Sequence, residues 1–161
     1  MSSDQDDLDT YLNNHAAGGT GAIEMAEHCE AANAGEPVAQ FLATLVADIK
    51  ADHQTLTDLM DALGTTRNPV KKMAARVGEK LTHLNLEGGD LGNLLTLEAL
   101  SLGVEGKACM WKSLEKVRDS SDVFAAVDFH ALIKRAENQR AGIEEWRLAV
   151  ATVALSKNVT D

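Results

Sequence analysis

The sequence contains few aromatic residues and few prolines. Aromatic side chains make up 4% of the 161 residues, and proline occurs only at Pro37 and Pro69. Because 45% of the residues are hydrophobic, a core for this chain must be built mainly from aliphatic side chains. Alanine (24 residues) and leucine (20 residues) supply more than a quarter of the sequence. This composition predicts an all-α protein that forms a single domain over residues 1–161.

Basic residues and long apolar runs are also scarce. Lysine and arginine number 15 against 25 acidic residues, which gives a formal charge of −10. Nucleic acids and anionic membranes are recognised by basic surfaces, so neither is expected as a partner. The longest apolar stretch, Leu148–Leu155, is too short to span a membrane. The acidic N-terminus lacks the features of a secretory signal, so we expect a flexible segment at residues 1–6 and a cytoplasmic location.

Cysteine occurs twice, at Cys29 and Cys109. The two residues are far apart in the sequence and form no CxxC motif. In a reducing compartment, isolated cysteines of this kind are typical of small buried hydrophobic residues. We therefore expect both thiols to be buried, with no disulfide bond between them and no redox role.

Apolar residues recur at alternating spacings of three and four along four long stretches, which predicts four amphipathic helices. Glycine follows the first two stretches, at Gly35 and Gly64, where it can adopt the left-handed conformation that ends a helix. The predicted helices are Asp6–Asn33, Pro37–Leu63, Leu91–Arg118 and Asp128–Ser156.

The connections between these helices differ greatly in length. The first and last pairs are joined by short segments, the second being Asp119–Val127 with one expected helical turn, so each pair should be antiparallel. Residues 65–90 form a long crossover that contains a helical apolar pattern of its own. This order predicts an antiparallel four-helix bundle with a short crossover helix, whose apolar positions are Val70, Met73, Val77, Leu81 and Leu84.

Several polar residues fall on the predicted apolar faces. An unpaired charge in a protein interior is costly, so these residues require partners. Counting along the helices from each turn places His15 level with Asp52, and it also brings two glutamates level with two arginines. The expected pairs are His15 with Asp52, Glu105 with Arg140, and Glu98 with Arg147. The sequence therefore predicts a buried network of these six residues.

The order and lengths of the helices resemble those of the ferritin-like superfamily. The segment LEALSLGVEGKACMW at Leu97–Trp111, together with Asn68–Lys71, looks like an uncharacterised bacterial family of such bundles. The resemblance extends from Tyr11 to Leu155. It implies a ferritin-like bundle, and in the di-metal members a Glu from each of two helices and a Glu-x-x-His motif from each of the other two bind the metals.

That ligand pattern is absent from this sequence, because no histidine follows an acidic residue by three positions. Our first hypothesis is therefore a non-enzymatic helical bundle without a cofactor, in which an ion-pair network replaces the di-metal site. Such a protein would act by oligomerisation or by binding an unidentified protein or small ligand. The apolar arcs are wider than one bundle core requires, which favours a homodimer.

Two alternatives remain. In the first, a noncanonical site for iron, manganese or zinc gives the bundle a metal-binding or redox role, with the arginines turned outward. Its ligands would be His15, Asp52, Glu98 and Glu105. In the second, Arg140 and Arg147 line a pocket for an anion or small ligand. Three glycines near the middle of the first helix would either leave room for it or allow a neighbouring helix to approach closely: Gly18, Gly19 and Gly21.

Overall fold

The computed structural model describes residues 3–66 and 89–156, and these residues form helices and short connections without any strand. The prediction of an all-α protein is thus confirmed over these ranges. Four helices are long, and two short helical turns lie between the last two of them. The long helices are α1 (Ser3–Ala32), α2 (Ala39–Ala62), α4 (Gly89–Lys116) and α6 (Phe129–Ser156).

The helix boundaries lie within three residues of those predicted. Helix α1 begins at Ser3 and so includes residues 3–6, which the sequence assigned to a flexible terminus. Gly35 and Gly64 both adopt positive φ angles, +87° and +67°, directly after the first two helices. Residues with a Cβ rarely adopt this conformation, so these two glycines define where α1 and α2 end.

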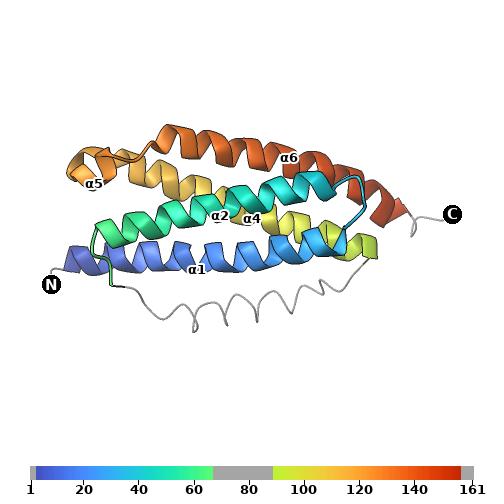
Figure 1. Cartoon of the computed structure of the whole chain (residues 1–161), viewed down its shortest axis with the longest axis horizontal. Helices are drawn as coiled ribbons and strands as arrows, with labels where there is room; N and C mark the ends of the chain where they lie inside the picture. Colours follow the sequence, from blue (N-terminus) through green and yellow to red (C-terminus); the bar gives the residue numbers. More distant parts are fainter. Residues whose placement is uncertain (1–2, 67–88, 157–161) are drawn as a thin grey trace.

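The four long helices lie side by side (Figure 1). Helix α2 runs back along α1, and α6 runs back along α4, so both predicted antiparallel pairs are present. Helices α2 and α4 run in the same direction, and α1 also packs against α4. The predicted crossover helix, with its apolar positions from Val70 to Leu84, lies outside the described residues.

Two short helical elements join α4 to α6. They are η1 (Arg118–Ser120) and α5 (Asp122–Ala125), which confirm the expected helical turn in this connection. The hydroxyl of Ser121 accepts a hydrogen bond of 3.1 Å from the backbone N–H of Val123 and so caps α5. The side chain of Phe124 from α5 is buried in the core.

The apolar core consists of two clusters, one towards each end of the long helices. The first cluster lies near the α1–α2 turn and includes Leu42, Leu45 and Ile49 of α2. The second contains Leu56 and Leu59 of α2 together with side chains from α4, α5 and α6. On α2, the segment between Ile49 and Leu56 marks the boundary between the two clusters.

The two cysteines occupy different environments. Cys29 is buried as expected, and burial raises the pKa of its thiol to about 11. Cys109 is exposed, so the prediction that it is buried was wrong. It lies on the outer side of α4, where its Sγ is 3.7 Å from a carboxylate oxygen of Glu105.

None of the described helices is apolar over a length sufficient to cross a membrane.

Candidate binding site at Asp52

Asp52 lies in the middle of the apolar face of α2. The buried residues of this helix follow the spacing of three and four from Leu42 through Ile49 to Leu56, and Asp52 occupies the position between Ile49 and Leu56 in that series. Its side chain is only 1% exposed. The predicted position of Asp52 within the apolar stripe is confirmed, and it places a carboxylate at the boundary between the two core clusters.

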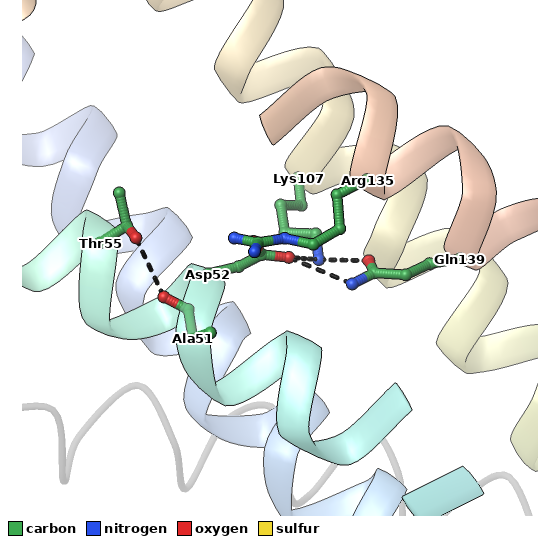
Figure 2. Close-up of polar contacts among 6 residues, drawn as sticks. All are labelled: Ala51, Asp52, Thr55, Lys107, Arg135 and Gln139. Atoms are coloured by element: carbon green, nitrogen blue, oxygen red, sulfur yellow. Dashed lines mark hydrogen bonds and ion pairs between the residues drawn. The ribbon is translucent and has the colours of Figure 1, made fainter. Parts of the chain in front are cut away.

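Three side chains from α4 and α6 surround the Asp52 carboxylate (Figure 2). Arg135 donates to Oδ1 through Nε at 2.7 Å and also through Nη2. Lys107 donates to Oδ2, and the amide of Gln139 donates to the same oxygen at 3.2 Å. A carboxylate has about four lone-pair positions, so these donors saturate Asp52.

The cluster formed by Asp52, Lys107, Arg135 and Gln139, called the Asp52 cluster below, is also bonded internally. Lys107 donates to the side-chain amide oxygen, Oε1, of Gln139 at 2.6 Å, so the Gln139 side chain bridges the lysine and the carboxylate. Burial lowers the pKa of Lys107, and the ion pair with Asp52 opposes that change. The Asp52 cluster joins α2 to both α4 and α6 through charge-assisted hydrogen bonds.

The predicted rungs between glutamate and arginine form, but they are not buried. Arg140 lies 2.5 Å from Glu105, and their side chains are 46% and 44% exposed. Arg147 lies 3.4 Å from Glu98, with side chains 24% and 44% exposed. The pairing was predicted with the correct partners, whereas the prediction that these four residues are buried was wrong. They connect α4 and α6 at the surface, where ion pairs contribute little to stability.

His15 is half-buried and does not bond to Asp52, whose oxygens are taken by α4 and α6. Its ring contacts Tyr11 edge-on, with the ring centroids 4.7 Å apart. Burial lowers the pKa of His15 below its ordinary value. The predicted ion pair between His15 and Asp52 was therefore wrong, because Lys107 and Arg135 neutralise the carboxylate instead.

The lowered pKa of His15 predicts a loss of stability at acid pH. Near and below pH 6.5 the unfolded chain binds a proton at this residue more readily than the folded protein does, so the free energy of unfolding falls as the pH falls. Urea denaturation between pH 7.5 and pH 5 will show a weaker dependence on pH in His15→Gln. Identical pH dependences in the two proteins would show that His15 titrates normally in the folded state.

A cavity of about 230 Å³ lies next to the Asp52 cluster, between α1, α2 and α4. Both Asp52 and Lys107 line it, and so do His15 and His53. Four glycines line the cavity, two on α1 and two on α4. They are Gly18, Gly19, Gly103 and Gly106.

Of the three glycines predicted to leave room for a pocket, Gly18 and Gly19 line the cavity and Gly21 does not. A Cβ at Gly19 would collide with the ring of His53, so this glycine permits a close approach of α1 and α2. Among the described residues, the cation in the cavity wall is Lys107 and not Arg140 or Arg147.

The four candidate metal ligands do not assemble into a site. Asp52 is saturated by cations, Glu98 and Glu105 pair with arginines at the surface, and His15 contacts Tyr11. Among the described residues, no three His, Cys, Asp or Glu side chains lie close enough to hold a metal ion. The di-metal centre implied by the ferritin-like resemblance therefore does not fit these residues.

Three members of the Asp52 cluster were not identified from the sequence. Lys107 and Gln139 both continue the apolar spacing of their helices, since Lys107 follows Val104 by three positions and Gln139 follows Ala136 by three. Arg135 precedes Ala136 directly and lies at the edge of that stripe. The apolar spacing on α4 and α6 therefore indicates that Lys107 and Gln139 face the core.

Comparison with known proteins gives no relative: no family model matches the chain, and no curated protein or solved structure matches it either.

Proposed function

We propose that this protein is a non-enzymatic helical binding protein of the ferritin-like arrangement, in which the Asp52 cluster occupies the position of a di-metal site. Two antiparallel helix pairs, with α2 and α4 running in the same direction, support the arrangement. A bundle with this order requires one long crossover, as in ferritin-like proteins.

The observation that carries the proposal is the cavity beside a saturated carboxylate. A catalytic carboxylate must exchange a proton or contact a substrate or metal, and all four acceptor positions of Asp52 are already engaged. The adjacent cavity combines apolar walls with a few polar groups, as ligand sites commonly do. We therefore assign the Asp52 cluster to positioning the helices around a small-molecule site.

A fragment screen with a cavity-filling variant tests this proposal. Gly106 lines the cavity, and a Cβ added there would meet none of the described atoms within 4 Å. Gly106→Leu should occupy space at the cavity wall without disrupting the fold. Ligand-observed NMR is expected to find compounds that bind the wild type and are lost in this variant.

The matched control is Ala47→Leu, which adds a leucine side chain at an exposed position of α2. Fragments that bind the cavity should bind this control as they bind the wild type. If every detected fragment bound Gly106→Leu equally well, the cavity would not be the binding site and the proposal would fail.

The homodimer inferred from the sequence stays a prediction. Several large aliphatic side chains on α4 and α6 are exposed in the single chain, with Leu102 reaching 76%. Exposed apolar side chains of this kind favour association when they are contiguous. They are Leu91, Leu102, Leu148, Val153 and Leu155.

A further inference from the structure

The size of the cavity limits what it can hold. An engineered cavity of about 150 Å³ in another protein binds benzene, so the volume of about 230 Å³ here leaves room for one ring with a small substituent. Most of the wall is apolar, and the fully buried Trp111 is one of the residues that line it. The other apolar side chains in the wall are Ala22, Ile49, Leu56, Val104 and Met110.

The charged part of the wall favours an anion. Among the described residues, Lys107 is the cation that lines the cavity, and Asp52 beside it is already paired with both Lys107 and Arg135. Two cations therefore face one carboxylate in the Asp52 cluster. Asp48 also acts on Lys107, but it is partly exposed to water and does not line the cavity. The Asp52 cluster thus has an excess of one positive charge beside the cavity.

Lys107 also has hydrogen-bonding capacity beyond the Asp52 cluster. An ammonium group carries three N–H donors, and the described bonds to Asp52 and Gln139 use two of them. The remaining donor can meet an oxygen of a bound molecule. His15 and Asn14 in the same wall supply further polar groups at the α1 side.

From these features we infer that the cavity binds a small monoanion with an apolar ring, of the aromatic carboxylate class. Its carboxylate lies against Lys107 and its ring against Trp111. This inference rests on the proposed function, because it names the ligand class of the same cavity. A neutral ring of equal size fills the same apolar space but leaves the third donor of Lys107 without an anionic acceptor.

Fluorescence titration with three matched probes tests the ligand class. The chain contains two tryptophans, so Trp146→Phe leaves Trp111 as the single indole reporter. The probes are benzoate, benzyl alcohol and benzylammonium, which share a ring and differ in charge. We expect benzoate to bind about ten-fold more tightly than benzyl alcohol, a difference of about 1.4 kcal/mol, and benzylammonium to bind most weakly.

A charge-removing variant locates the anion. In the Trp146→Phe background, Lys107→Met should weaken benzoate binding about ten-fold and leave benzyl alcohol unchanged. Asp52 keeps Arg135 and Gln139 as partners in this variant. Lys112→Met removes an exposed lysine on α4 and serves as the control, which should bind benzoate normally. If Lys107→Met does not fold, the affinities of the three probes for the Trp146→Phe protein test the ligand class without it.

The outcomes separate the two proposals. Benzyl alcohol binding as tightly as benzoate, or benzoate binding unaffected in folded Lys107→Met, would overturn the aromatic carboxylate class while the binding function stands. Failure of all three probes to bind would also overturn the ligand class. The proposed binding function itself would fail if, in the fragment screen, no fragment lost its binding in Gly106→Leu.

Discussion

Asp52→Asn is expected to lower the free energy of unfolding by about 3 kcal/mol, because it removes the buried carboxylate that Lys107 and Arg135 share. The amide preserves the shape of the side chain, so the loss reports on charge rather than on packing. Lys107 is 15% exposed and cannot fully rehydrate, whereas Arg135 is 35% exposed and can turn partly towards water. Urea denaturation followed by circular dichroism measures the difference.

The control for this substitution is Glu105→Gln. It removes one charge from the pair with Arg140, in which both side chains are nearly half exposed. The free energy of unfolding should change by less than about 0.5 kcal/mol, because exposed ion pairs contribute little. Equal effects of the two substitutions would mean that the Asp52 cluster is no more important to the fold than a surface ion pair.

Gly142→Ala is expected to destabilise the protein by about 1–3 kcal/mol, although alanine is the better helix former. A Cβ at Gly142 of α6 would collide with the ring of Phe41 on α2. Phe41 also packs against Trp146, with ring centroids 6.5 Å apart, so its displacement disturbs a second contact. Chemical denaturation of the variant measures the cost of displacing the Phe41 ring from Gly142.

Two further variants serve as controls for the effect of Gly142→Ala on stability. Gly103→Ala adds a methyl group where none of the described atoms lies within 4 Å, so it should stabilise the helix by about 0.5–1 kcal/mol. Combining Gly142→Ala with Phe41→Leu should recover part of the lost stability by removing the clash. A neutral or stabilising Gly142→Ala would contradict the tight packing of the Phe41 ring against Gly142.

The helices could be predicted from the sequence because their signals are local. The spacing of apolar residues and the two glycines that follow α1 and α2 act within one or two turns of the chain, and they placed the helix ends within three residues. The pairing of Glu105 with Arg140 followed from counting along two antiparallel helices. These inferences depend on helix geometry alone.

The residues of the Asp52 cluster could not be predicted by counting positions along the helices. Glu105 lies directly after Val104 in the sequence, at the edge of the apolar stripe, so a small rotation of α4 decides whether it is buried. The structure places Lys107 inside instead, where its long side chain reaches Asp52. Which of two neighbouring charges enters the core depends on packing between helices far apart in the sequence, and no local pattern fixes it.

The metal content of the purified, untagged protein tests most directly whether ion pairs replace a metal centre at Asp52. Cells would be grown with iron, manganese and zinc, and elemental analysis would report each metal per chain. We predict far less than one ion per chain, and no increase on incubation with any of the three metals. About one or two ions per chain that disappear in Asp52→Asn would contradict the account, because metals and not Lys107 and Arg135 would then hold the carboxylate.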